Sequence, residues 1–266
     1  MRLLAYGILL DEACPHVRTV LGLNGEPVSL ARQGSLAVAH SPVSPAFLEP
    51  SLKHLRQYAA VVEALHRAAA VLPMRYGCCF ETETEMQLAL REHAGEYAAA
   101  LKEAEGCVEL GVRVLLQGPA GVQSTTARPP EASGKLSGVG YLLRRRQRFA
   151  ETDRRKARAQ REALSIMKVF HGLYVRCSYE FSAGTSSFIR VPMLSLYFLV
   201  MRAQEHAFRV RFHAWSKENR GTAILSGPWP PYNFVPTPAR AVSASKQLDC
   251  RGRHEPSITW NPEQWP

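Results

Sequence analysis

Residues 1–105 alternate short apolar runs with longer stretches of helical period. Leu3–Leu10 is a continuous apolar run, which predicts a buried strand, and Val28–Ala31 and Leu36–Ala39 beside turn-forming residues predict two more. The intervening pattern allows a short helix from His16 to Leu21.

From residue 50 to 70 the apolar positions recur every three or four residues, which indicates a helix with one buried stripe that ends before Pro73. Residues 74–80 then predict a strand. A second helix starts at the acidic residues 81–83 and runs to Gly106. This order favours an antiparallel sheet with helices on one face.

The clearest period of two lies at 108–116, which predicts a half-buried strand. An aperiodic loop over 117–138 leads to a long helix over 139–170. We expect the inner face of that helix to follow a repeat of seven: Leu143, Ala150, Ala157 and Leu164.

Strands are predicted at 173–181, 194–201 and 221–226, with a helix over 203–219 between the last two. The inward residues of that helix should be Ala207, Val210 and Ala214. The resulting order is βαββαβ, the ferredoxin-like arrangement. We therefore predict an α+β protein with antiparallel sheets and two domains, 1–105 and 106–236, followed by a Pro-rich extension at 237–266.

Charge is divided unevenly between these parts. The 266 residues carry a net charge of +10 and 46% hydrophobic residues, which excludes intrinsic disorder. Residues 1–105 hold 9 basic and 12 acidic side chains, whereas 106–236 hold 20 and 8. The six cysteines contain no C-x-x-C pair, and the first apolar run is too short for a membrane span and lacks a cleavage site. We expect a cytoplasmic protein without membrane contact.

The excess of positive charge is concentrated on the long helix. The basic residues within eighteen positions are Arg144, Arg145, Arg146, Arg148, Arg154, Arg155, Lys156, Arg158 and Arg161. This density indicates either a contact with an anion or acidic protein, or a solvated outer face. Nucleic acid is the less favoured partner, because no aromatic stacking platform or known binding module accompanies the arginines.

Motifs for chemistry are missing or incomplete. The segment 133–136 lacks two residues of a phosphate-binding loop, and 184–188 ends in the wrong residue for G-x-S-x-G. The histidines do not have metal-ligand spacing. We therefore predict no catalytic residues, no cofactor and no metal.

An aromatic and proline-rich segment, Gly227–Val235, follows the last strand. Its prolines Pro228, Pro230 and Pro231 stiffen the backbone that presents Trp229, Tyr232 and Phe234. One interpretation is a docking surface with these aromatic residues as anchors. The favoured one is a lid that packs over the protein's own core.

This segment, G-P-W-P-P-Y-N-F-V, resembles the motif that closes the folded region in the GvpL/GvpF family of gas vesicle accessory proteins. A second family hallmark appears at 71–80 as V-L-P-M-R-Y-G-C-C-F. It contains Pro73, Met74, Arg75, Tyr76 and Gly77. Shorter similarities at 4–7, 24–28, 108–114 and 140–146 keep the family's order.

The resemblance implies a cytoplasmic, non-enzymatic protein that helps to build gas vesicles, the protein-walled organelles that give buoyancy. Members of the family are minor components or assembly factors that contact the small hydrophobic shell protein and other vesicle proteins, and they contain a ferredoxin-like module. The partner-binding candidates are Arg144, Arg145, Arg148, Trp229, Tyr232 and Phe234. The alternative hypothesis is a nucleic-acid-binding module that uses the Arg-rich helix.

Overall fold

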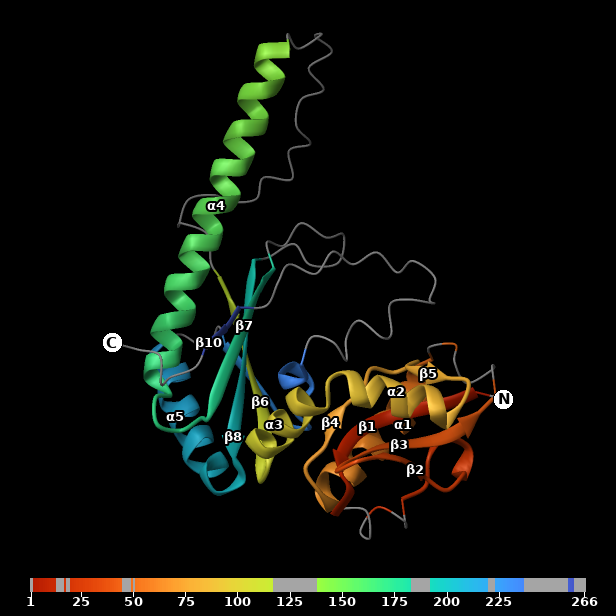
Figure 1. Cartoon of the computed structure of the whole chain (residues 1–266). Helices are drawn as coiled ribbons and strands as arrows, with labels where there is room; N and C mark the ends of the chain where they lie inside the picture. Colours follow the sequence, from red (N-terminus) through yellow and green to blue (C-terminus); the bar gives the residue numbers. More distant parts are fainter. Residues whose placement is uncertain are drawn as a thin grey trace.

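The computed structural model describes residues 2–12, 17, 20–44, 49, 51–116, 138–182, 192–219, 223–236 and 258–260. Two antiparallel sheets lie side by side, and one long helix, α4, extends well beyond its sheet (Figure 1). The α+β class and the two antiparallel sheets expected from the sequence are confirmed.

The first sheet is built around the continuous apolar run at the start of the chain. Its order is β2-β3-β1-β4, and β5 also pairs with β1. The strands are β1 (Arg2–Leu10), β2 (Ser29–Gln33), β3 (Leu36–Val43), β4 (Leu72–Pro73) and β5 (Cys79–Phe80). Because β1 has partners on both edges and helices over both faces, six consecutive residues of it are buried.

Three helices cover the first sheet. Helix α1 (Leu52–Ala68) starts at Ser51, whose hydroxyl accepts a hydrogen bond from the backbone N–H of His54, and it packs over the face with Leu4 and Tyr6. Helices α2 (Glu83–Glu92) and α3 (Ala94–Ala104) pack over the opposite face. Helices therefore lie on both faces, not on one. The predicted single helix to Gly106 is also wrong, because the helical dihedrals break at His93 (φ −128°, ψ 25°).

Only Cys79–Phe80 of the predicted strand at 74–80 form a strand, β5, and the residues before them form a turn between β4 and β5. The backbone N–H of Cys78 donates to the carbonyl of Arg75 over 3.1 Å, and Gly77 has a φ of 85°. A positive φ suits glycine, which has no Cβ to clash with the backbone. The turn lets two short segments pair with the same edge of β1.

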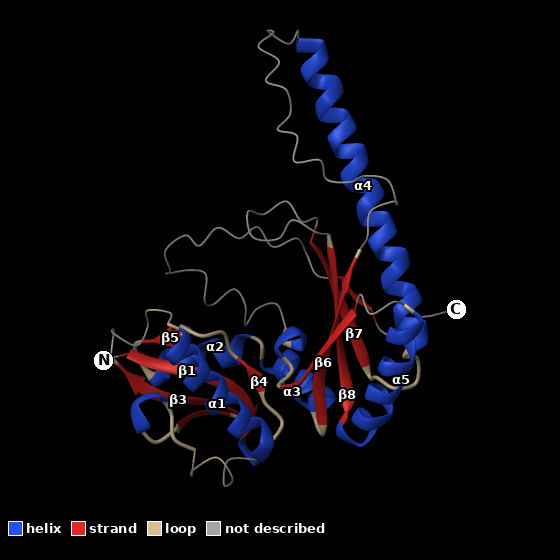
Figure 2. Ribbon diagram, turned by 180° about the vertical axis from the view of Figure 1, so that it is seen from behind, coloured by secondary structure: helices blue, strands red, loops and turns tan. Residues whose placement is uncertain are grey.

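The second sheet has the order β10-β7-β8-β6-β9. Its strands are β6 (Cys107–Leu115), β7 (Arg176–Ser182), β8 (Met193–Met201), β9 (Ala223–Trp229) and β10 (Ile258–Trp260). Helices α4 (Gly138–Val169) and α5 (Glu205–Glu218) pack on one face (Figure 2). The predicted βαββαβ order is present as β6-α4-β7-β8-α5-β9.

Three short 3-10 helices complete the described elements: η2 (Leu23–Gly25), η4 (Arg202–Gln204) and η5 (Tyr232–Phe234). Of the predicted helix at 16–21, residues 17, 20 and 21 are described and are not helical, and the other three lie outside the described residues. The predicted loop from 117 to 137 also lies outside them, as do 237–257 and 261–266 of the extension. The three residues of the extension that are described, 258–260, pair with β7.

Strand β6 differs from the half-buried strand that its period of two predicted. It lies between β8 and β9, and the residues from Cys107 to Val112 are buried on both faces. Even the carboxylate-bearing Glu109 is only 4% exposed. The first part of the face that the pattern assigned to solvent is covered by other parts of the chain, whereas Arg113 and Leu115 on the same face are exposed.

The inner faces of α4 and α5 also differ from the predictions. Along α4 the buried residues are Ala159, Ala163, Ile166 and Met167, followed by Phe170 just beyond its end, whereas Ala150 and Ala157 are exposed. The repeat of seven failed because only the last part of α4 reaches the sheet. Helix α5 buries Phe208 and Phe212 instead of the three smaller residues, and Val210 is 56% exposed. The larger aromatic side chains gain more from leaving water.

Candidate functional site

The two motifs that gave the sequence its resemblance meet at the junction between the two sheets. Segment η5 belongs to the G-P-W-P-P-Y-N-F-V motif and contacts β4, which belongs to the motif at 71–80. In Figure 1 η5 is blue and lies between the sheets. Tyr232 packs against the core of the first sheet, whereas Phe234 packs against Cys107 and Leu199 of the second. Val235 returns to the first sheet. Neighbouring residues of one short segment therefore bind opposite halves of the molecule.

A buried carboxylate fixes this segment to β6. One oxygen of Glu109 accepts a hydrogen bond of 2.8 Å from the backbone N–H of Asn233, and the other accepts one of 2.6 Å from the side-chain amide of Asn233. A charged acceptor strengthens both bonds. These two hydrogen bonds compensate the cost of removing the Glu109 carboxylate from water.

The start of the segment is shaped by Gly227. Its φ is 106°, the Gly227–Pro228 peptide is cis, and a Cβ at this position would lie 2.6 Å from the carbonyl oxygen of Glu109. The carbonyl of Gly227 accepts a hydrogen bond of 2.8 Å from Arg209, which also forms an ion pair with Glu205. Glycine is therefore needed here for both its backbone angle and its lack of a side chain.

The motif at 71–80 is anchored by a buried tyrosine of α1. The hydroxyl of Tyr58 lies 2.8 Å from the carbonyl oxygen of Met74 and 3.0 Å from that of Ala5 and can donate to either. Burial raises its pKa well above the ordinary value, so the hydroxyl keeps its proton. The Tyr76 ring contacts Tyr58 edge-on, with ring centroids 5.3 Å apart. This motif holds the edge of the first sheet in place.

Polar contacts add to the junction at its periphery. Arg176 of β7 forms an ion pair of 2.9 Å with Glu103 of α3, and Arg202 donates to the backbone carbonyl of His66 over 3.1 Å. Burial and the positive charge of Arg202 together lower the pKa of His66 to about 4. The His66 ring is therefore neutral at ordinary pH.

The structure separates the six partner-binding candidates. Trp229 is 44% exposed, so the favoured lid interpretation is wrong for this residue, whereas Phe234 is 4% exposed and fits it. Tyr232 is half-buried against the first sheet. Arg144, Arg145 and Arg148 belong to α4, but their side chains lie outside the described residues. Sequence reasoning missed Glu109 and Asn233, because neither stands out without its partner.

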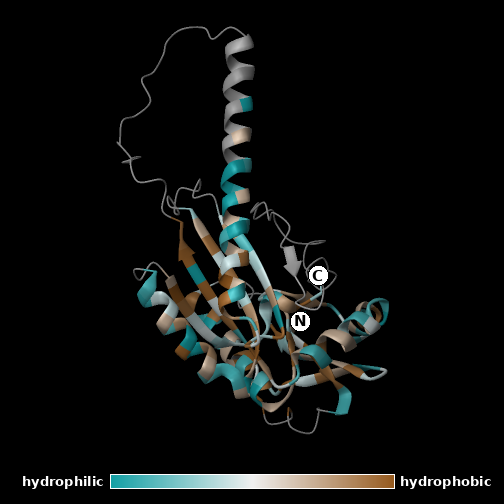
Figure 3. Ribbon diagram, turned by 90° about the vertical axis from the view of Figure 1, so that its left-hand side faces the viewer, coloured by the Kyte–Doolittle hydropathy of each residue, from teal (hydrophilic) through white to brown (hydrophobic). Residues whose placement is uncertain are grey.

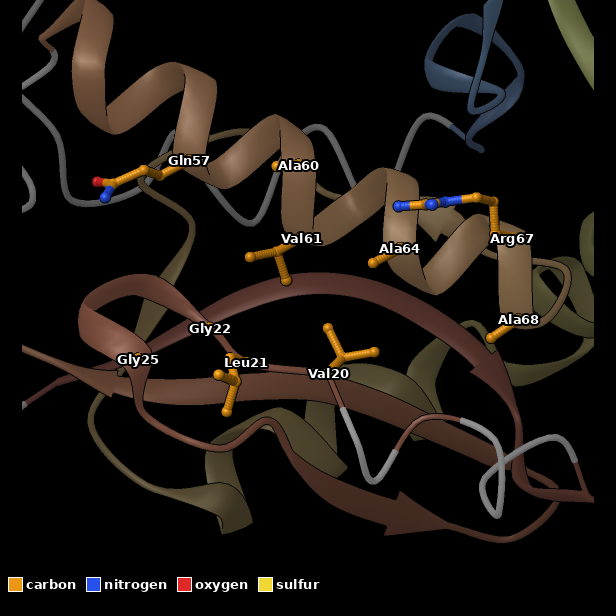
Figure 4. A pocket seen from close by; sticks show the side chains of 10 residues that line it. All are labelled: Val20, Leu21, Gly22, Gly25, Gln57, Ala60, Val61, Ala64, Arg67 and Ala68. Atoms are coloured by element: carbon orange, nitrogen blue, oxygen red, sulfur yellow. The ribbon is translucent and has the colours of Figure 1, made fainter.

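An open pocket of about 780 Å³ lies between α1 and the chain around η2 (Figure 4). Ala60, Ala64 and Ala68 line it from α1, with Val20 and Leu21 opposite and Arg67 at the rim. Its lining lacks the acid, base or nucleophile that a catalytic site needs. Among the described residues no group of His, Cys, Asp or Glu is arranged to hold a metal ion, and no helix is long and apolar enough to cross a membrane.

Comparison with known proteins gives a consistent result. Residues 2–236 match the family described as gas vesicle synthesis protein GvpL/GvpF. Gas vesicle protein L from Streptomyces sp. (strain CB03234) is 28% identical over 235 residues, covering 80% of this chain and 85% of that protein. Gas vesicle protein F from the same strain is 26% identical over 239 residues, covering 86% and 98%.

Solved structures support the same fold. The crystal structure of GvpF from Microcystis aeruginosa superposes with a TM-score of 0.64 at 16% identity, covering 88% of this chain and 99% of that one. GvpF from Anabaena sp. PCC7120 gives a TM-score of 0.60 at 17% identity, with 88% and 98% covered. The junction between two sheets described above therefore belongs to a fold that other solved proteins share.

Proposed function

Because this chain belongs to the GvpL/GvpF family of gas vesicle synthesis proteins, we propose that it is a non-catalytic assembly factor of gas vesicles. In this role it contacts the small hydrophobic shell protein and other vesicle proteins and is associated with the gas vesicle in the cytoplasm. The observation that carries the proposal is the family match over 2–236, which includes both sheets and the junction.

The arrangement of the molecule is consistent with a binding role. Segment η5 ties the two halves together, because Tyr232 packs on the first sheet while Phe234 and the hydrogen bonds between Asn233 and Glu109 hold the second. Surfaces on both halves are therefore presented together. Two surfaces are candidates for partner contact. The first is the N-terminal part of α4, which contains Arg144, Arg145 and Arg148. The second is the exposed Trp229, because an aromatic side chain that is not needed by the protein's own core is a typical anchor in interfaces.

Deletion of the gene from a vesicle-forming host tests the role. We expect vesicles to be absent or stunted while growth is unchanged, as seen by electron microscopy and by loss of flotation. Normal vesicles in the deletion strain would contradict the proposal.

Capture of partners tests the surfaces. Purified protein is immobilised and presented with the shell protein and with each other vesicle protein in turn. A variant with Arg144→Glu, Arg145→Glu and Arg148→Glu should capture less partner, whereas a control with the same change of charge on α1 should bind normally. The nucleic-acid alternative predicts instead that binding to RNA or DNA falls by orders of magnitude between low and moderate salt. Such binding without capture of any vesicle protein would favour the alternative.

A further inference from the structure

The part of α4 nearest the sheet presents a regular row of arginines to solvent. Arg154, Arg158 and Arg161 follow one another at spacings of four and three, and all are exposed. The buried residues of α4, which start at Ala159, lie on the opposite side of the helix. In Figure 3 this stretch of α4 is hydrophilic where the helix leaves the sheet.

This row is unfavourable for an isolated helix. Like charges three or four residues apart repel each other, by about 0.2–0.5 kcal/mol per pair. Over the whole of α4 the sequence has 10 basic and 3 acidic residues, so the repulsion is not balanced within the helix. Contact with an acidic surface would relieve it, and the desolvated pairs would strengthen the contact.

The same chain carries a surface of the opposite charge. Residues 81–105, which form α2, α3 and their flanks, contain 7 acidic residues and only 2 basic ones. The exposed acidic residues are Glu81, Glu83, Glu85, Glu92, Glu96 and Glu105. Of these, Glu83 also lies 3.4 Å from the ring of His40, and Glu85 accepts a hydrogen bond from the backbone N–H of Glu81. The buried side of α2, with Met86 and Leu90, packs on the first sheet, so the acidic side faces outward.

These two surfaces lie on different halves of the molecule. Helix α4 extends away from the second sheet, whereas α2 covers the first sheet at the other side of the molecule (Figures 1 and 2). Within one chain the arginine row and the acidic surface stay apart, because the junction fixes the two halves in their relative positions. A second copy of the chain can bring the two kinds of surface together.

We propose that two copies of this protein associate through the Arg154–Arg158–Arg161 row of one and the acidic α2–α3 surface of the other. Because the contact joins different patches, each copy has one patch of each kind to offer to a neighbour. The inference names a partner for α4 and rests on the proposed use of that helix for protein contact. It is tested with the purified chain alone, so its failure can be told apart from a failure of the assembly role in cells.

The experiment measures mass by light scattering across a concentration series. At about 0.05 M salt the wild type should exceed its monomer mass, and at about 0.5 M salt it should return to it, because screening shortens the reach of the charges. The monomer mass is 29.6 kDa. A monomer at every concentration and at low salt would overturn the proposal.

Charge exchange tests the surfaces themselves. Arg154→Glu with Arg158→Glu, and separately Glu81→Lys with Glu92→Lys, should each weaken self-association by about tenfold or more. Mixing the two variants should restore a complex. The unchanged row of the second variant meets the unchanged acidic surface of the first, and the two reversed patches also match each other. If mixing gives no complex while each variant alone is monomeric and folded by circular dichroism, the proposed pairing is wrong.

Control variants separate the surface effect from net charge. Lys53→Glu with Arg56→Glu on α1, and Glu26→Lys with Glu218→Lys, change net charge equally at exposed positions outside both patches. They should leave self-association within about twofold of the wild type. An equal loss in the controls would show a general charge effect and would contradict the specific contact. Loss of RNA binding in the Arg154 and Arg158 variant, with the wild type monomeric, would assign the row to nucleic acid instead.

Discussion

The hydrogen bonds between Glu109 and Asn233 should behave as one coupled unit when either residue is changed. Asn233→Ala removes the 2.6 Å bond from the side-chain amide and leaves the 2.8 Å bond from the backbone N–H. A hydrogen bond to a charged group contributes about 1.5–3 kcal/mol, so the free energy of unfolding should fall by about that amount.

Glu109→Gln is expected to cost more, about 3–5 kcal/mol. The change replaces one acceptor oxygen by an NH₂ group, which then faces an N–H donor in a site where Glu109 is 4% exposed. One buried donor of Asn233 is left without its acceptor, and the other bond loses the charge that strengthened it.

The double variant distinguishes a real contact from two unrelated effects. Once Asn233 is replaced by alanine, the amide introduced at position 109 has one donor fewer to oppose it, so the two changes together should cost about 1–2 kcal/mol less than their sum. Urea unfolding followed by circular dichroism gives each free energy, with an unchanged slope as the sign that the native state is intact. Glu105→Gln, at an exposed position next to β6, is the matched control and should stay within about 0.5 kcal/mol of the wild type. Costs that add to within about 0.5 kcal/mol would refute the contact.

Three further predictions concern the same junction. Gly227→Ala should lower the melting temperature, because the new Cβ would lie 2.6 Å from the carbonyl oxygen of Glu109 and the backbone at residue 227 has a φ of 106°. A thermal scan that matches the wild type would show that the segment adjusts freely. Phe234→Ala should destabilise the fold by about 3–5 kcal/mol, whereas Trp229→Ala, at 44% exposure, should cost clearly less in the same denaturant titration; equal costs would argue against the exposed placement of Trp229. Burial and Arg202 lower the folded-state pKa of His66 to about 4, below its ordinary value of 6.5, so stability should be full above about pH 6.5 and decline as the pH falls toward 4. Burial also lowers the pKa of His40, so this residue adds to the loss of stability at low pH. The variant His66→Gln should therefore make the melting temperature depend less steeply on pH without removing the dependence. An unchanged slope of melting temperature against pH would exclude His66 as a contributor.

Local patterns in the sequence were enough to identify the main elements of the fold. The continuous apolar run of β1, the three-and-four spacing of α1 and the apolar β8 each lie within one short segment, and their periods directly reflect which faces are buried. The glycine signal at Gly34 placed the turn between β2 and β3 for the same reason, but the turn at Gly77 was missed. The division at 105 and 106 into two domains stays a prediction, because η5 packs on both sheets.

Only the tertiary structure decided whether the polar face of a strand is buried. The alternation along β6 is typical of a strand with one face in solvent, yet that face is covered at Cys107 and Glu109 by η5. Segment η5 lies more than a hundred residues further along the chain. The pattern of a strand records which of its own side chains are apolar, and Glu109 is polar whether it meets water or Asn233. For the same reason the sequence could not tell that Trp229 stays exposed while Phe234 is buried, or where along α4 the sheet begins. Those outcomes depend on which distant segments fill the space beside each residue, and only the folded chain fixes that.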